Sequence, residues 1–299
     1  MRSDPILCIG SVLWDVIGRS ASAMRLGNDV PGRIAQVPGG VAMNIAMALA
    51  RLGLQPRLLT SIGRDAEGDL LVAAAERLGI DTSLAYRSDD LPTDRYMAIE
   101  GANGLIAAIA DAHSLEVAGE RILEPLSDGR LSRPDAPYRG TVALDGNLSE
   151  PLLAQIATGA LLAEADLRVA PASPGKALRL KPFLGHAKAV IYVNLEEATL
   201  LLGLPQDDSM TAADAARMLV AHGAARAVVT DGGREAAVAD ASDVLTAMPP
   251  RVLIARVTGA GDTFMAAHIA AETRNDAPRQ ALEYALATAA AYVSGDVGS

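Results

Sequence analysis

The strongest constraint on the fold of this chain is a regular alternation between short apolar runs and longer stretches with helical periodicity. Short apolar runs that are each followed by a helical stretch favour parallel strands joined by helices. Most of these runs are nearly continuous in apolar residues, so both faces of the resulting sheet are expected to be covered. The sequence therefore predicts an α/β fold with a mostly parallel central sheet.

The expected elements follow from this pattern. Strands are predicted at residues 5–9, 57–62, 141–145, 167–170, 189–193, 227–230 and 236–239. Helices are predicted at residues 41–53, 67–78, 150–163, 174–184, 196–203, 212–222, 260–273 and 277–294.

Two stretches, residues 11–38 and 83–112, break the alternation and look like strands and turns without long helices. We expect them to form a small β-stranded lid over one edge of the main sheet, because such flaps exclude water from reacting groups. Residues 127–140 carry prolines, glycines and mixed charges and predict an exposed connection. Since the alternation resumes directly afterwards, we expect residues 1–299 to form a single domain.

Charge and cysteine content exclude several classes of partner. The formal net charge of −10 disfavours a nucleic acid polymer or an anionic membrane as the main partner. No apolar run reaches membrane-spanning length, and no secretory leader precedes the first expected strand. The single cysteine, Cys8, lies in an apolar run and is expected in the core, which fits a cytoplasmic protein. The four histidines are scattered, so a zinc site is not expected.

The most informative motif is Val-Thr-Gly-Ala-Gly-Asp-Thr-Phe at residues 257–264, which leads directly into an apolar helix. A helix start presents unpaired backbone N–H groups, and Gly259 and Gly261 would let that backbone approach an anion closely. Asp262, beside such a cradle, could accept a proton from an attacking hydroxyl. The alternative is that Asp262 simply caps the helix.

Two further features near the beginning of the chain could bind hydroxyl groups. Gly39 and Gly40 permit a tight turn before a helix, and Asn44, one turn into that helix, offers both donors and an acceptor. A plain junction between loop and helix with a buried polar cap is the alternative. Asp15 follows the first expected strand, and ligands of open parallel sheets bind at the carboxyl ends of strands.

Three later motifs also follow apolar strands or turns. Asn194 and Glu197 share one face of a starting helix and carry the oxygen ligands that Mg²⁺ prefers, although a capping pair explains them equally well. The turn 230–233, Thr-Asp-Gly-Gly, could carry a nucleotide phosphate or ribose. Asp65, in Gly-x-Asp-x-x-Gly at residues 63–68, is expected to cap the following helix.

The order of these motifs, from Ile6 to about Val293, resembles the ribokinase-like (PfkB) carbohydrate and nucleoside kinases. The resemblance implies a three-layer α/β/α sandwich with a small β-stranded lid, and an enzyme that uses ATP and Mg²⁺ to phosphorylate a sugar or nucleoside. It implies that Asp262 is the general base, with Gly259, Ala260 and Gly261 in the anion-binding turn. It also assigns roles to further positions: substrate binding to Asp15, Gly39, Gly40 and Asn44, ATP binding to Asn194, Thr230, Gly232, Gly233 and Thr258, and Mg²⁺ binding through water to Asn194 and Glu197.

Within this family, three local strings resemble pseudouridine kinases. They are Val-Pro-Gly-Arg-Ile at residues 30–34 leading into Val-Pro-Gly-Gly at 37–40, Asp-Gly-Asn-Leu-Ser at 145–149, and Pro-Ala-Ser-Pro-Gly-Lys-Ala at 171–177. The resemblance implies phosphorylation of the 5′-hydroxyl of pseudouridine, with ribose, another sugar or another nucleoside as the alternative.

The sequence also departs from the family pattern and leaves other functions open. Leu13 stands where relatives commonly carry an asparagine, which removes a polar contact to the sugar or base, and Val193 replaces a common proline. Arg95 in the lid could reach a polar substrate group or simply face solvent.

A sugar- or nucleoside-binding regulatory protein without turnover is the alternative from another class. A nicotinamide-dependent dehydrogenase is disfavoured, because no Gly-x-Gly-x-x-Gly turn follows the first strand. An exposed lid could pair two copies into a homodimer.

A third departure gives a testable prediction about potassium. Many relatives bind a monovalent cation through a carboxylate at the position that Arg256 occupies here. A guanidinium cannot ligate potassium and itself carries a positive charge, so we predict weak or no potassium activation. The rate of phosphate transfer, measured against potassium concentration at fixed ionic strength, should stay constant. Strong activation would contradict this expectation.

Overall fold

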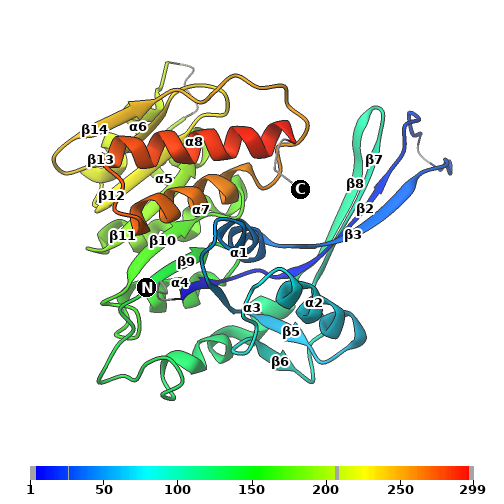
Figure 1. Cartoon of the computed structure of the whole chain (residues 1–299), viewed down its shortest axis with the longest axis horizontal. Coiled ribbons are helices and arrows are strands. Elements are labelled where there is room, and N and C mark those ends of the chain that lie inside the picture. The colour runs from blue at the N-terminus through cyan, green and yellow to red at the C-terminus, as the bar shows by residue number, and fades with distance from the viewer. Residues whose placement is uncertain (1–4, 26, 206–208, 296–299) are drawn as a thin grey trace.

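The computed structural model describes residues 5–25, 27–205 and 209–295 (Figure 1). An eight-stranded sheet runs through its centre in the order β14-β13-β12-β11-β10-β9-β1-β4. The six neighbouring strands from β12 to β4 pair in parallel, whereas β13 and β14 are antiparallel to their neighbours. The strands of this sheet are β1 (Ile6–Ile9), β4 (Pro56–Leu59), β9 (Thr141–Asp145), β10 (Asp166–Ala170), β11 (Ala189–Asn194), β12 (Arg226–Thr230), β13 (Ala236–Asp240) and β14 (Val244–Ala247).

Helices cover both faces of this sheet, which confirms the three-layer architecture (Figure 1). One face is covered by α1 (Val41–Arg51), α2 (Ala66–Arg77), α7 (Ala260–Thr273) and α8 (Pro278–Ser294). The other face is covered by α3 (Ser114–Ala118), η1 (Gly119–Leu126), α4 (Glu150–Thr158), η2 (Pro174–Gly185), α5 (Leu195–Leu202) and α6 (Ala212–Ala221).

The first strand shows why its sequence is apolar at every position. Leu7 and Ile9 pack into the core on the α4 side, whereas Ile6 and Cys8 pack into the core on the α1 side. Successive side chains of a strand point to opposite faces, so a strand with helices on both sides needs no polar position. Cys8 is fully buried, as its apolar surroundings in the sequence predicted.

A second sheet projects from the body as a lid (Figure 1). Its order is β3-β2-β7-β8, with β2 (Leu13–Arg19), β3 (Arg33–Gly39), β7 (Arg95–Gly101) and β8 (Gly104–Asp111). Within the stretch 83–112, which was expected to contain strands and turns, β7 and β8 form an antiparallel hairpin. Part of the stretch 83–112 lies outside this lid, because β6 (Tyr86–Ser88) pairs instead with β5 (Ser61–Gly63) in a separate two-stranded sheet.

Several predicted boundaries were wrong for local reasons. The strand expected at 57–62 is divided into β4 and β5, since its partner β1 ends at Ile9 and β5 then pairs elsewhere. The segment expected as a helix at 174–184 is the 3₁₀ helix η2, which contains Pro182, a residue without the N–H of an α-helical hydrogen bond. Helix α4 ends at Thr158, before Gly159. The short elements α3, η1 and β14 were not predicted.

The lid is anchored to the body by two carboxylates at its base. Asp65 caps α2 by accepting from the amide of Gly68 at 2.7 Å, as predicted, and also accepts from the amide of Thr93 at 2.8 Å. Asp94 is buried and accepts from the amide of Ser114 at 3.0 Å. These bonds fix both ends of the β7–β8 hairpin relative to the central sheet.

Candidate active site

The polar residues singled out in the sequence gather at the carboxyl edge of the central sheet, next to the base of the lid. The ends of β9, β11 and β12 lie at this edge, and α1 and α7 begin beside it. The register pairs Asn194 with Thr230, so the ends of β11 and β12 are direct neighbours. Loops at the carboxyl ends of parallel strands are the usual ligand-binding edge of such a sheet.

The first and last motifs of the sequence meet in one hydrogen bond. Nδ2 of Asn44, in α1, donates to Oδ2 of Asp262, in the first turn of α7, at 2.9 Å. Neither residue acts as the helix cap that was considered as an alternative. Gly40 and Gly259 are the N-cap residues, and neither of them makes a side-chain capping bond. The side chains of Asn44 and Asp262 are therefore available to a shared site.

The turn before α7 has the conformation that its glycines allow. Gly259 has a φ of 83°, in the left-handed region that favours glycine. In α-helix geometry the amides of Gly261 and Asp262, in the first turn of α7, have no acceptor within the helix. The amide of Ala260 donates to the carbonyl oxygen of Val257 at 3.0 Å, so it is already engaged here. The turn thus offers an anion two amides and the positive end of a helix dipole.

The carboxyl group of Asp262 has an unusual pKa. This pKa is raised to about 7, mainly by burial; the nearby carboxylates of Asp145 and Glu197 add to the rise, and the bond from Asn44 opposes it. A carboxyl group with a pKa near neutrality can exchange a proton with a hydroxyl group, which suits a general base. The geometry and the pKa together allow Asp262 to accept a proton next to an anion-binding turn.

Asn194 and Glu197 form a reciprocal capping box at the start of α5. Oδ1 of Asn194 accepts from the amide of Glu197 at 2.8 Å, and Oε2 of Glu197 accepts from the amide of Asn194 at 2.8 Å. Burial raises the pKa of Glu197. The local alternative considered for this pair is therefore correct. The pair still places a nearly buried carboxylate close enough to Asp262 for their charges to interact.

The donor set at this edge fits a divalent cation with oxygen ligands. Carboxylate and amide oxygens are the ligands that Mg²⁺ prefers, and a positive charge would offset the repulsion among Asp145, Glu197 and Asp262. Within residues 5–25, 27–205 and 209–295, no three His, Cys, Asp or Glu side chains are grouped so that they could hold a metal ion by themselves. The fit is therefore to Mg²⁺ held through one or two side chains together with water and substrate phosphate oxygens.

The other predicted positions of the late motifs lie on the loop after β12 and on the turn before α7. Thr230 is the last residue of β12 and is partly buried. Gly232 has a φ of 56°, and neither Gly232 nor Gly233 has a neighbouring atom within 4 Å of a Cβ built on it, so this turn is open to a ligand. Thr258 is exposed, and its carbonyl oxygen accepts from the hydroxyl of Tyr292 at 3.0 Å.

Asp15 lies on the lid strand β2, directly against the glycine pair. A Cβ on Gly39 would lie 2.1 Å from Oδ2 of Asp15, and a Cβ on Gly40 would lie 2.4 Å from the carbonyl oxygen of Ser11. Burial raises the pKa of Asp15 to about 6. Both glycines are thus required by close approach, and they bring this carboxylate to the start of α1. Leu13 is buried and pairs with Gly39 across the strands, so it offers no polar group there.

Arg95 does not share the face of the lid that carries Asp15. It pairs with Trp14, whereas Asp15 pairs with Tyr96, and neighbouring residues along a strand point to opposite faces. Arg95 is exposed, as the alternative interpretation predicted.

The site contains one residue that sequence reasoning did not place in it. Asp145, at the end of β9, is completely buried and accepts from the amides of Ser11 at 2.8 Å, Ala42 at 3.0 Å and Asn147 at 2.8 Å. It therefore satisfies an amide at the start of α1, where Gly40 has no side chain to do so. Asp145 is the last residue of an apolar strand, as Asn194 and Thr230 are. This shared position is the signal in the sequence that could have identified it.

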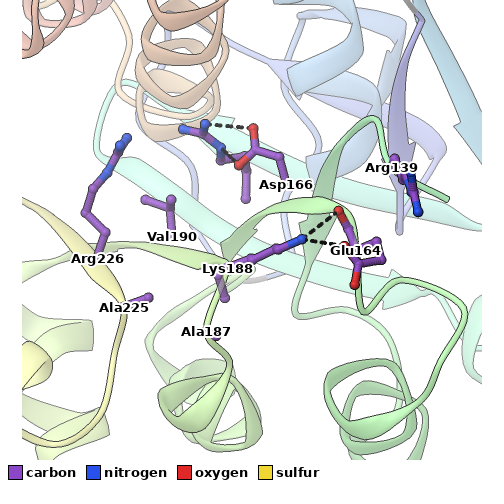
Figure 2. A pocket seen from close by; sticks show the side chains of 10 residues that line it. Arg139, Glu164, Asp166, Ala187, Lys188, Val190, Ala225 and Arg226 are labelled. Atoms are coloured by element: carbon purple, nitrogen blue, oxygen red, sulfur yellow. Dashed lines mark hydrogen bonds and ion pairs between the residues drawn. The ribbon is translucent and has the colours of Figure 1, made fainter. Parts of the chain in front are cut away.

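A cavity lies at the opposite, amino edge of the sheet and is unrelated to these groups (Figure 2). It has a volume of about 420 Å³. The ion pair of Lys188 with Glu164 spans 2.8 Å, and that of Arg168 with Asp166 spans 2.7 Å. Arg168 and Arg226 also pair with Glu272 near the end of α7. These cations already have carboxylate partners, so we interpret the cluster as a structural ion network.

No helix of the described residues is both long and apolar enough to cross a bilayer.

Comparisons with known proteins cover nearly the whole chain. A family model described as pfkB family carbohydrate kinase matches residues 3–296. The pseudouridine kinase of Escherichia coli (strain K12) is 28% identical over 268 residues, which are 89% of this chain and 82% of that protein. A carbohydrate kinase from Agrobacterium tumefaciens has a TM-score of 0.81 and 27% identity, with 100% of this chain and 94% of that chain covered. The Arabidopsis thaliana ribokinase complexed with ribose and ATP shares the fold, with a TM-score of 0.78 and 19% identity over 100% of this chain and 94% of that one.

The contact between Asn44 and Asp262 gives a prediction about pH. A base must be deprotonated to act, so kcat/KM should fall about tenfold per pH unit below the pKa of Asp262, which is about 7. The Asn44→Ala substitution removes a donor that stabilises the charged carboxylate, so the pKa rises and the acid limb moves to higher pH. A hydrogen bond to a charged group is worth roughly 1.5–3 kcal/mol, or about one to two pH units.

The matched control is Gln36→Ala, which removes a lid amide that donates to Glu67 at 2.8 Å and leaves Asp262 untouched. Its acid limb should coincide with that of the unmodified protein. An unmoved limb in Asn44→Ala would contradict the assignment of Asp262 as the titrating group.

Proposed function

The chain belongs to the pfkB family of carbohydrate kinases and is a phosphotransferase with an alcohol group as acceptor, and we propose that it phosphorylates the 5′-hydroxyl of pseudouridine with ATP as donor. The observation that carries this proposal is the hydrogen bond from Asn44 to Asp262 at 2.9 Å. It joins a group suited to sugar hydroxyls with a base that adjoins an anion-binding turn.

In the proposed reaction, Asp262 removes the proton of the acceptor hydroxyl. The acceptor oxygen forms a bond to the γ-phosphorus, the bond from that phosphorus to the oxygen bridging it to the β-phosphate breaks, and ADP leaves with that oxygen. The amides of Gly261 and Asp262 stabilise the charge on the transferring group, because they are fixed in the first turn of α7. Positioning and charge stabilisation are the main requirements of phosphoryl transfer.

The donor side of the proposed site is formed by the late motifs. Thr230, Gly232, Gly233 and Thr258 would line the path of ATP. The Arabidopsis ribokinase, which shares this fold, is complexed with ATP and supports ATP as the donor. Asn194 and Glu197 would hold Mg²⁺ through water, and the ion when bound would neutralise phosphate charge. Since Asn194 and Glu197 lock each other by two hydrogen bonds, their oxygens are fixed before ATP arrives.

The acceptor side is formed by Asp15, Gly39, Gly40 and Asn44. A carboxylate such as Asp15 can accept from two neighbouring hydroxyls of a ribose. Leu13 is buried beside Gly39 and offers no hydrogen-bonding group to a substrate at that point. The lid above this region would exclude water from the reacting groups.

Pseudouridine is favoured over other acceptors by two observations. The pseudouridine kinase of Escherichia coli matches most of the chain. Two of the strings that resemble pseudouridine kinases also lie in contact, because Nζ of Lys176 donates to Oδ1 of Asn147 at 2.7 Å. Asp145 begins the first of these strings at the carboxyl edge, and Lys176 of the second lies close enough for its charge to act on Asp145.

We propose that residues 1–299 act as one kinase unit with its lid, and that this reaction takes place in the cytoplasm, where ATP is available. The single buried cysteine fits a reducing compartment.

An ATP-consumption screen tests the proposed substrate. With pseudouridine, ribose, uridine, adenosine, cytidine and fructose at equal concentration, pseudouridine should give the highest kcat/KM.

The Asp262→Asn substitution tests the proposed base. It should reduce kcat by about 10²-fold or more and leave substrate binding nearly unchanged, because the amide fills the same space but cannot accept the proton. Near-full activity of this variant would refute the mechanism.

Other outcomes of the screen identify a different function. Faster turnover of ribose or another nucleoside would replace the substrate and keep the mechanism. No phosphate transfer to any acceptor, together with thermal stabilisation by these ligands, would instead indicate a binding protein without turnover.

The lid carries an apolar surface on the side opposite to Asp15. Cross-strand pairing places Ile34 beside Gly18, Gly18 beside Ile99, and Met97 beside Ile109. We call Ile34, Met97, Ile99 and Ile109 the outer lid face; Ile34 is 80% exposed and Ile109 is 67% exposed. We propose that a second copy of this chain covers it, because an uncharged apolar surface is complementary to itself across a two-fold axis.

The oligomeric state tests this interface. Light scattering after size exclusion should give a dimer for the unmodified chain and a monomer for Ile109→Lys. Leu178→Lys is the control, because Leu178 is also exposed but lies on η2 and should leave the dimer intact. A monomeric unmodified chain would refute the interface.

A further inference from the structure

Tyr292, in the last turn of α8, packs against the turn that precedes α7. Its hydroxyl donates to the carbonyl oxygen of Thr258 at 3.0 Å. The same hydroxyl lies 2.6 Å from the place that a Cβ on Gly259 would occupy. One side chain therefore both binds the peptide before Gly259 and fills the space beside it.

Arg256 fixes the position of this tyrosine. The guanidinium carbon of Arg256 lies 4.0 Å from the centroid of the Tyr292 ring, and Nε of Arg256 donates to the backbone oxygen of Tyr292 at 2.8 Å. The amides of Ala255 and Arg256 also donate to the backbone oxygen of Val293, at 2.9 and 3.2 Å. The segment before the turn is thus joined to the end of α8 through both backbone and side chain.

These contacts hold the turn before α7, whose conformation directs the first amides of that helix. The direction of the first amides of α7 depends on the peptide between Thr258 and Gly259, and Gly259 holds a left-handed conformation. An amide that is displaced by about 1 Å from a transferring group can cost about 10²-fold in rate. Tyr292 comes from another helix, α8, and its hydroxyl touches both Thr258 and the space beside Gly259.

We propose that Tyr292 is a positioning residue for phosphoryl transfer, and that Arg256 holds Tyr292 in place. Tyr292 acts on the amides of Gly261 and Asp262 through Thr258 and Gly259 and does not itself touch the substrate. The inference rests on the proposed function, because it assumes that these amides receive the transferring phosphoryl group.

The Tyr292→Phe substitution removes the hydroxyl and retains the ring beneath Arg256. We expect kcat to fall about tenfold, with the KM values for acceptor and ATP within about twofold of the original, because the lost bond orients groups that act in the transition state. Tyr284→Phe is the matched control. Tyr284 lies in the same helix, and its ring also packs against an arginine, Arg274, at 4.4 Å. Among the described residues no hydrogen bond or ring contact joins Tyr284 to the turn before α7, so Tyr284→Phe should retain full activity.

A double-mutant cycle with Gly259→Ala tests the contact itself. The added methyl meets the Tyr292 hydroxyl in the original protein, whereas Tyr292→Phe removes that hydroxyl and leaves the ring carbon at 3.2 Å. The strain of a left-handed alanine is the same in both backgrounds. The fold-loss of kcat caused by Gly259→Ala should therefore be at least about threefold smaller in the Tyr292→Phe background than in the original protein. Losses that simply multiply would overturn the proposal.

Binding of a phosphoryl mimic separates this proposal from the proposed function. ADP with Mg²⁺ and beryllium fluoride occupies the position of the transferring group, whereas ADP alone does not. Tyr292→Phe and Arg256→Met should each weaken binding of the mimic about tenfold and leave ADP binding unchanged. Arg256→Lys should restore only part of the loss, since lysine lacks the planar stacking group.

If the original chain binds the mimic tightly and Tyr292→Phe binds it equally well, the positioning role alone is refuted. If the original chain binds neither ADP nor the mimic, the proposed function fails and this inference fails with it.

Discussion

The hydrogen bond between Asn44 and Asp262 is the contact on which the candidate site depends. It joins two residues that are 218 positions apart in the chain. Asn44 lies in the first turns of α1 and Asp262 in the first turn of α7, so the bond brings the beginnings of two helices to the same carboxylate. The positive ends of helix dipoles stabilise negative charge within about one turn, and both helices here direct that end at one place. An anion that enters this place meets donors from the first and the last third of the chain.

Three acidic side chains, Asp145, Glu197 and Asp262, lie near the carboxyl edge of the sheet, and their surroundings stabilise them in different ways. Asp145 is completely buried but satisfied by three backbone amides, and Glu197 is satisfied by its capping box. Asp262 accepts one side-chain bond from Asn44, and its pKa is raised to about 7 by burial and by its acidic neighbours. The first two carboxylates thus serve mainly the structure, while their charges tune the third. At the amino edge the balance differs, since Lys188 pairs there with Glu164 and Arg168 pairs with Asp166 (Figure 2). Arg226 also pairs with Glu272 near the end of α7.

Close backbone approach explains why glycine is required at several points of the site. A Cβ on Gly10 would lie 2.2 Å from Oδ2 of Asp145, and a Cβ on Gly39 would lie 2.1 Å from Oδ2 of Asp15. Each of these glycines therefore lets a carboxylate lie directly against the chain. At Gly259 the neighbour is a tyrosine hydroxyl from α8. The same physical requirement thus appears at the lid, at the first strand and at the turn before α7.

The sequence by itself determined the layered architecture, since strands that are buried on both faces must be apolar at successive positions, as Ile6–Ile9 illustrates. It also determined which polar residues follow the strands, including Asn194 and Thr230, because helix caps and strand ends have local signatures. It misjudged elements whose limits are set by a partner, such as β4, which ends where β1 ends, and η2, where Pro182 interrupts α-helical bonding. Only the tertiary structure decided that Asn44 contacts Asp262, that Asp145 supports the start of α1, and that Tyr292 adjoins Gly259. Local patterns record the conformation of neighbouring residues, whereas these contacts depend on how helices far apart in the chain pack against one sheet.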